Sequence, residues 1–281
     1  MKVVICPNPF RDIGFAVTGK AVALLKEAGF EALVSPIFSD GTAELPGDLP
    51  LIELREAAQV CALAVVIGGD GTILAAVRGM GEKPLPVLGV NLGTKGFMAP
   101  LEPERLPLIV EAAKGNYVAS ERMMLDVLLE REGQAVCRDV ALNDAVIHGY
   151  GECVNITVWC DGERVTHFSG DGVIVSSPTG STGYSMSAGG PIVEPGAEAL
   201  ILSPICAHTM GARPFVIGAG RTITVSTEKL PTRRAYLSVD GNPGFDLCNG
   251  DILTVRRSDR RVTMLSVGGK SFYENAYEKL I

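Results

Sequence analysis

A glycine-rich segment that contains a single acid carries the strongest chemical signal in this chain. Residues 68–72 read Gly-Gly-Asp-Gly-Thr; the apolar run 63–67 precedes them, and a helical pattern follows at 73–78. A strand, a glycine turn and a helix start would place backbone N–H groups and the positive end of a helix dipole beside Asp70. An acid in such a phosphate-binding turn indicates metal handling or proton removal. The segment therefore indicates phosphoryl transfer, unless Asp70 only caps the helix.

A second glycine-containing loop follows the next predicted strand. Residues 91–97 read Asn-Leu-Gly-Thr-Lys-Gly-Phe. In a doubly wound sheet, the ends of successive strands line one crevice in which ligands bind. Phe97 could stack on a heterocycle there, or it could equally be a core aromatic residue.

A third segment is rich in hydroxyl groups. Asp171-Gly172 leads through a short apolar run into residues 176–190, which read Ser-Ser-Pro-Thr-Gly-Ser-Thr-Gly-Tyr-Ser-Met-Ser-Ala-Gly-Gly. Such a loop offers many hydrogen-bond donors to a polar ligand, and its glycines permit close approach. The alternative is a serine-rich surface loop, which is disfavoured because apolar runs on both sides would bury its ends.

The pair Asn143-Asp144 lies between the apolar triplets 140–142 and 145–147. Two adjacent polar side chains within an apolar strand are costly unless they are paired. They therefore either form a buried hydrogen-bond network or face a ligand, and the spacing alone favours neither.

Several other chemistries find no support in the sequence. The three histidines are scattered, which argues against a zinc site. The P-loop pattern is absent, and Gly69-Asp70-Gly71 lacks the third glycine of a dinucleotide fingerprint. The formal net charge of −7 argues against a nucleic-acid partner. Phosphate ligands stay possible, because Mg²⁺ and backbone N–H groups can hold them locally.

The predicted secondary structure around these segments differs between the first and second parts of the chain. Up to about residue 115, strand and helix patterns alternate, which predicts a doubly wound, mainly parallel sheet. The expected strands are 3–6, 32–34, 63–67 and 86–90, the expected helices are 16–28, 72–80 and 102–114, and a surface loop is expected at 38–50.

From about Tyr117, short alternating strands with turn signals predict an antiparallel β domain. The expected strands are 122–130, 154–158, 222–227, 235–239, 252–255 and 262–267. We therefore expect an α/β domain at 1–117 and a β-rich domain at 118–269, with a C-terminal helix at 270–281 that packs back on the first.

Composition indicates a cytoplasmic protein. The seven cysteines are odd in number and lack C-x-x-C spacing, so they read as buried thiols in a reducing compartment. The longest apolar stretch, 60–67, is too short to cross a bilayer. Pro7 and Arg11 interrupt the apolar N-terminus, which favours a first strand over a signal peptide.

Taken together, these motifs resemble those of the NAD kinase family. The glycine turn is shared with diacylglycerol, sphingosine and 6-phosphofructo kinases, whereas the hydroxyl-rich segment is much more specific. The Asn-Asp pair and residues 208–214, which read His-Thr-Met-Gly-Ala-Arg-Pro, complete the set. The motifs follow the family order between about residues 66 and 242.

The resemblance implies an N-terminal α/β domain, an all-β C-terminal domain and an NAD site between them. The implied reaction moves a phosphoryl group from ATP, or another donor, to the 2′-hydroxyl of the adenosine ribose of NAD. Asp70 matches the family's catalytic acidic residue, whose carboxylate would act as a general base. The positions that match NAD contacts are Gly71, Phe97, Asn143, Asp144, Asp171, Thr182, Tyr184 and Ser187. Mg²⁺ or another divalent cation would arrive with the donor, no membrane partner is implied, and a homodimer or homotetramer is expected.

The chain departs from the family pattern at a few positions. Asp144 stands where Glu is usual and is one methylene shorter, so its ribose contact would need a water or a small shift. Ser169-Gly170 replaces a frequent basic residue, Gly183 replaces Ala, and Asp240-Gly241-Asn242 falls at a further family motif. The alternatives are a lipid kinase that shares the glycine turn, and a nucleotide-sensing protein without catalysis.

Overall fold

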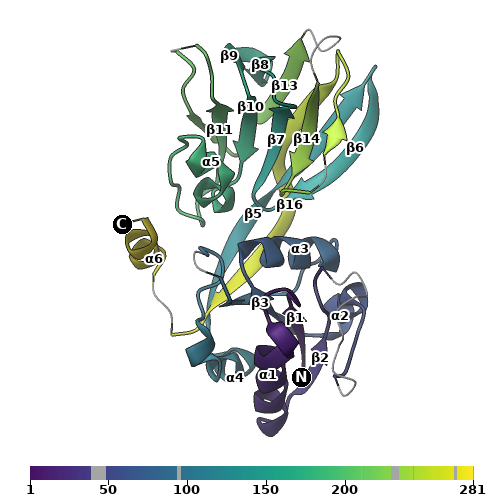
Figure 1. The fold of residues 1–281 in the computed structure, drawn as a ribbon, viewed down its shortest axis with the longest axis vertical. Helices are drawn as coiled ribbons and strands as arrows, with labels where there is room; N and C mark the ends of the chain where they lie inside the picture. The colour runs from purple at the N-terminus through teal and green to yellow at the C-terminus, as the bar shows by residue number, and fades with distance from the viewer. Residues whose placement is uncertain are drawn as a thin grey trace. The chain divides into compact units, whose positions relative to one another are not determined.

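The computed structural model describes residues 1–38, 49–93, 96–209, 211–228, 234–242, 244–268 and 271–280. The chain divides into two compact units; the first consists of residues 1–121 and 262–281, and the second of residues 122–261 (Figure 1). The strands β5 (Val118–Arg131) and β16 (Ile252–Ser266) contain the points of division, so each contributes residues to both units. Most of the surface loop expected at 38–50 lies outside the described residues.

Four parallel strands form the centre of the first unit, in the order β2-β1-β3-β4. They alternate with helices along the chain, as parallel pairing requires, because each connection must return to the same end of the sheet. The elements are β1 (Lys2–Pro7), η1 (Ile13–Phe15), α1 (Ala16–Glu27), β2 (Glu31–Val34), α2 (Leu54–Val60), β3 (Leu63–Gly68), α3 (Asp70–Met80), β4 (Val87–Asn91), η2 (Pro103–Arg105), α4 (Leu108–Ala113) and α6 (Phe272–Leu280).

Helices cover both faces of this sheet. Helices α1 and α4 pack against one another, and so do α2 and α3. Ile5 of β1 shares an apolar cluster with Leu25 of α1 and Ile109 of α4. The neighbouring residues Val4 and Cys6 point to the opposite face and are equally buried. Because both faces are covered, the strands are continuous apolar runs, which is why they could be predicted from the sequence.

One expected helix and two expected strands were wrong in detail. The helix expected at 102–114 is broken into η2 and α4, because Pro103 and Pro107 each begin a helical turn and lack the N–H that would continue one. The strands expected at 252–255 and 262–267 are one strand of 15 residues, β16. Its last part lies in the first unit, where Met264 pairs in parallel with Val87. The charged stretch 256–261 between the two predicted strands continues the strand.

The second unit contains two antiparallel sheets that share one apolar core. One sheet joins β9, β8, β13 and β16, and β16 also pairs with β5, the partner of β6; the other has the order β12-β11-β10-β7-β14-β15. The elements are β6 (Gln134–Ala141), β7 (Asp144–Gly149), β8 (Val154–Cys160), β9 (Glu163–Gly170), β10 (Gly172–Ser176), η3 (Thr179–Thr182), α5 (Tyr184–Ser187), β11 (Ala199–Ile205), β12 (Phe215–Gly218), β13 (Thr222–Glu228), β14 (Ala235–Val239) and β15 (Phe245–Asp246).

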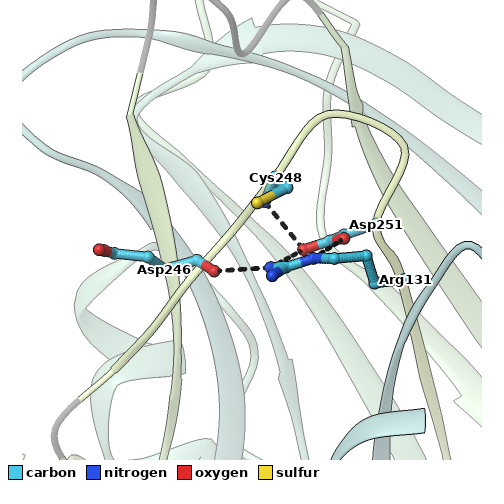
Figure 2. A network of polar contacts seen from close by, with 4 residues as sticks. All are labelled: Arg131, Asp246, Cys248 and Asp251. Atoms are coloured by element: carbon cyan, nitrogen blue, oxygen red, sulfur yellow. Dashed lines mark hydrogen bonds and ion pairs between the residues drawn. The ribbon is translucent and has the colours of Figure 1, made fainter. Parts of the chain in front are cut away.

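A polar network fastens the end of β5 to the loop between β15 and β16 (Figure 2). Arg131 donates from Nε and Nη2 to the two carboxylate oxygens of Asp251, at 2.9 and 2.8 Å. The same Nη2 donates to the carbonyl oxygen of Asp246, and the backbone N–H of Cys248 donates to Asp251. Asp251 is buried, and this bidentate pairing satisfies its charge. The network has a structural role.

The expected fold class is confirmed, because a parallel α/β unit and an antiparallel β unit are both present. No helix within the described ranges has the length and apolarity that a membrane span requires. All seven cysteines are free thiols. The expectation that they are buried was wrong for Cys206 and Cys248, which follow strand ends and are exposed, and Cys153 is only half-buried.

Candidate functional site

Asp70 is fixed by the loop that follows the neighbouring strand. It occupies the first position of α3, with only Gly69 between it and the end of β3. Its Oδ2 accepts a hydrogen bond from the backbone N–H of Phe97 at 2.8 Å, and its Oδ1 accepts one from Met98 at 3.1 Å. The two glycine-rich segments are thus joined through one carboxylate. Both segments follow strands whose carboxyl ends lie at the same edge of the sheet.

Burial raises the pKa of the Asp70 carboxyl above its ordinary value. The backbone N–H groups of Phe97 and Met98 and the charge of Lys279 act in the opposite direction without cancelling that effect. Lys279 belongs to α6, and its ammonium lies 5.5 Å from the centre of the Phe97 ring. The result is a half-buried carboxylate that is held in one orientation and is a stronger proton acceptor than a free aspartate.

The position of the carboxylate depends on a glycine. An ideal Cβ atom at Gly96 would lie 2.7 Å from Asp70 Oδ1, which is closer than real Cβ contacts. We expect Gly96→Ala to push the carboxylate aside. With Asp70 as the proposed catalytic group, turnover should fall by roughly tenfold, because small displacements of such a group are costly. Steady-state kinetics would measure the loss. The control is Gly19→Ala on α1, where a Cβ would meet nothing within 4 Å. Equal kcat values for both variants would contradict the prediction.

In the second unit, a carboxylate holds the Asn143-Asp144 pair in place. Asp240, at the end of β14, accepts hydrogen bonds from the backbone N–H groups of Leu142 at 2.8 Å, Asn143 at 2.7 Å and Asp144 at 3.1 Å. The pair was expected inside a strand, which was wrong for Asn143. Strand β6 ends at Ala141 and β7 begins at Asp144, so Leu142 and Asn143 form a turn around the Asp240 carboxylate.

The hydroxyl-rich loop packs directly on this turn. Ser177 donates from its hydroxyl to the carbonyl oxygen of Leu142, and its N–H donates to the carbonyl oxygen of Asn143. A Cβ atom at Gly180 would collide with the backbone of Asn143, so only glycine permits the approach. The buried Oδ1 of Asn143 has no hydrogen-bond partner among the described residues. An acceptor in this state favours a ligand-facing role for the pair over a closed internal network.

Asp144 is buried, and no described basic side chain pairs with it. Burial, and then the nearby charge of Asp240, raises its pKa from 3.8 to about 7. Burial also raises the pKa of the Tyr184 phenol, with smaller contributions from Tyr236, Cys206, Asp171 and Asp144. The Tyr184 ring therefore lies within electrostatic range of both aspartates.

The raised pKa of Asp144 predicts a pH-dependent stability. The folded chain binds this proton more tightly than the unfolded chain, so stability falls as pH rises from 3.8 to about 7. We expect Asp144→Asn to melt at a higher temperature than the wild type at about pH 8, and the two curves to converge near pH 4. Thermal unfolding across that range is the measurement. A constant difference between the two proteins would show that Asp144 does not titrate in this way.

The other predicted site residues make few contacts with Asp70 or with the Asn143-Asp144 turn. Asp171 lies between β9 and β10, with Cys153 Sγ 3.9 Å from its Oδ1. Thr182 donates to the carbonyl oxygen of Thr179 at 3.3 Å, within η3. Ser187 ends α5 and is exposed, and its side chain makes no hydrogen bond within the described ranges. Gly71 faces open space, since an added Cβ would meet nothing within 4 Å.

The structure thus forms two clusters of predicted residues, each within one unit. The first unit brings Asp70 and Phe97 together beside Gly71, and the second brings Asn143 and Asp144 together with Tyr184 near Asp171. Sequence reasoning gave no role to Asp240 or Lys279. For Asp240, the signal was its place in the family-like motif Asp240-Gly241-Asn242 at a strand end. For Lys279 there was no signal, because its neighbours Phe97 and Asp70 are distant in sequence.

Comparison with known proteins identifies the family. Residues 48–113 match the model of the ATP-NAD kinase N-terminal domain, and residues 142–267 match that of the C-terminal domain. An NAD kinase of Geotalea daltonii is 39% identical over 221 residues, which cover 78% of each chain. An NAD kinase of Acetivibrio thermocellus is 34% identical over 277 residues, which cover 98% of this chain and 95% of the relative.

Two solved structures have the same fold along the whole chain. The yeast NADH kinase complexed with NADH has a TM-score of 0.84 at 25% identity and is matched over 87% of its length. An NAD kinase from Archaeoglobus fulgidus in complex with ATP has a TM-score of 0.76 at 25% identity and is matched over 98%. The alignments cover 100% of this chain in both cases. With its glycine turn, its Asn-Asp pair and its hydroxyl-rich loop in family order and folded as described, this chain belongs to the NAD kinase family.

Proposed function

We propose that this chain phosphorylates NAD on the 2′-hydroxyl of its adenosine ribose, with ATP as donor, and that Asp70 is the base that accepts the hydroxyl proton. Family membership makes the chain a kinase. The proposal for Asp70 rests on one observation: its carboxylate is oriented by two backbone N–H groups and has a raised pKa. A base with these properties suits a weakly acidic ribose hydroxyl.

Phosphoryl transfer needs alignment, charge neutralisation and a proton acceptor rather than covalent catalysis. Mg²⁺ takes most of its ligands from donor phosphates and water, so it would need few ligands from the protein. Asp70 is the carboxylate of the glycine turn that could contact such an ion. The cation would neutralise phosphate charge.

The second unit would bind NAD through the turn at Asn143 and Asp144. The unpaired Oδ1 of Asn143 and the carboxylate of Asp144 are acceptors for ribose hydroxyls. Asp171, Thr182, Tyr184 and Ser187 are proposed as further NAD contacts, as are Gly71 and Phe97 of the first unit. The contacts in the second unit would thereby hold a ribose of NAD through its hydroxyl groups.

One assay tests the proposed function. Purified protein is incubated with Mg-ATP and either NAD, NADH or a diacylglycerol dispersion, and the products are separated by chromatography. We expect NADP from NAD and no phosphatidic acid. Phosphatidic acid without NADP would identify a lipid kinase that shares the glycine turn. Tight NAD binding without NADP, also with polyphosphate or other nucleoside triphosphates as donors, would identify a sensing protein.

A further inference from the structure

An arginine from the loop after β1 lies against both glycine-rich segments of the first unit. An ideal Cβ atom at Gly69 would lie 3.5 Å from Nη1 of Arg11, and one at Gly93 would lie 2.6 Å from the same nitrogen. Gly69 and Gly93 follow β3 and β4, and Arg11 follows β1. These three strands are parallel neighbours, so their carboxyl ends share one edge of the sheet. The guanidinium therefore lies beside both turns, closest to Gly93.

The backbone that carries Arg11 is firmly held. The carbonyl oxygen of Asn8 accepts the N–H groups of Arg11 at 3.0 Å and Asp12 at 2.8 Å, and Asn8 Oδ1 accepts that of Phe10 at 3.0 Å. Asn8 Nδ2 donates to Thr72 Oγ1 at 3.1 Å, which ties the loop to helix α3. Asp12 accepts the N–H groups of Val17 and Thr18 in α1. The loop is thus anchored on both sides of Arg11.

The guanidinium itself is exposed and is not neutralised. No carboxylate of the described residues forms an ion pair with Arg11. Asp70 is directed elsewhere, toward the N–H groups of Phe97 and Met98. The positive charge that lowers the pKa of Asp70 is that of Lys279. The acid and the arginine therefore both lie beside the glycine turn without pairing with one another.

We propose that Arg11 binds the phosphate groups of the phosphoryl donor at the glycine turn, while Asp70 acts on the acceptor hydroxyl. The inference rests on the proposed function and adds a residue to it. A guanidinium presents two parallel N–H donors, the geometry that phosphate oxygens accept best. Glycine at position 93 leaves room for the guanidinium, because a Cβ atom there would lie 2.6 Å from its Nη1. An arginine so placed would also neutralise charge on the donor during transfer.

The test measures donor binding directly as well as turnover. Mg-ATP and magnesium tripolyphosphate are titrated calorimetrically into the full chain for the wild type, Arg11→Gln, Arg11→Lys and Arg55→Gln. The last is a matched control, because Arg55 is an exposed arginine on α2 of the same unit. The KM values for ATP and NAD and the melting temperature are measured for the same four proteins.

We expect Arg11→Gln to weaken both donors and raise the KM for ATP by about tenfold to a hundredfold, the loss typical of a charge-assisted hydrogen bond. The KM for NAD and the melting temperature should stay at the wild-type values, Arg55→Gln should bind as the wild type, and Arg11→Lys should fall between. The proposal would be overturned if Arg11→Gln bound both donors as tightly as the wild-type protein does. It would also be overturned if the wild-type protein bound neither donor. If the wild type forms no NADP, the proposed function fails, and the titrations still decide the role of Arg11.

Discussion

Replacing Asp70 by asparagine should reduce turnover by at least about 10²–10⁴-fold, the contribution of a positioned general base. The variant keeps the size of the side chain, and one amide oxygen can still accept an N–H from the loop at Phe97 and Met98. NAD binding should therefore change little. Initial rates at saturating NAD and ATP, together with NAD titrations of the same protein, would measure both effects.

The matched control for Asp70→Asn is Glu56→Gln. Glu56 lies in the first turn of α2, another helix of the same unit, and it is exposed. This control should have wild-type turnover. The raised pKa of Asp70 gives a second readout, because wild-type turnover should fall as pH drops through a value above that of ordinary aspartate. Normal turnover in Asp70→Asn would remove Asp70 from the mechanism.

Replacing Asp240 by asparagine should weaken both the second unit and its use of NAD. Asparagine tolerates the positive φ of 50° at this position, so the backbone can stay as it is. Its amide NH₂ would, however, face N–H groups of residues 142–144 that now donate to the carboxylate. We expect a loss of about 3 kcal/mol in the free energy of unfolding. We also expect a decrease of roughly 10²-fold in kcat/KM for NAD, because the Asn143-Asp144 turn loses its support.

Chemical denaturation and NAD-dependent kinetics measure these two effects of Asp240→Asn. The control is Asp259→Asn, an exposed position on β16. The variant should also lower the pKa of Asp144, because one of the two causes that raise it is the charge of Asp240. Its stability should then depend less on pH than that of the wild type. If stability and the KM for NAD both equal those of the wild type, Asp240 does not position the turn.

The sequence alone predicted those features of the structure that depend on residues close together in the chain. Apolar runs predicted the strands at 3–6 and 63–67, and glycine next to Asp70 predicted a strand–turn–helix connection. The order of the motifs along the chain was enough to predict the family to which the chain belongs. These inferences succeeded because strand and helix periodicity and turn chemistry are set by neighbouring residues.

The tertiary structure alone decided which distant groups meet. It joined Asp70 to Phe97 across 27 positions and Asp240 to Asn143 across 97, and it laid Arg11 against Gly69 and Gly93. Such contacts depend on which strands become neighbours in a sheet. Burial of the apolar faces fixes that order, and no local pattern in the sequence encodes it.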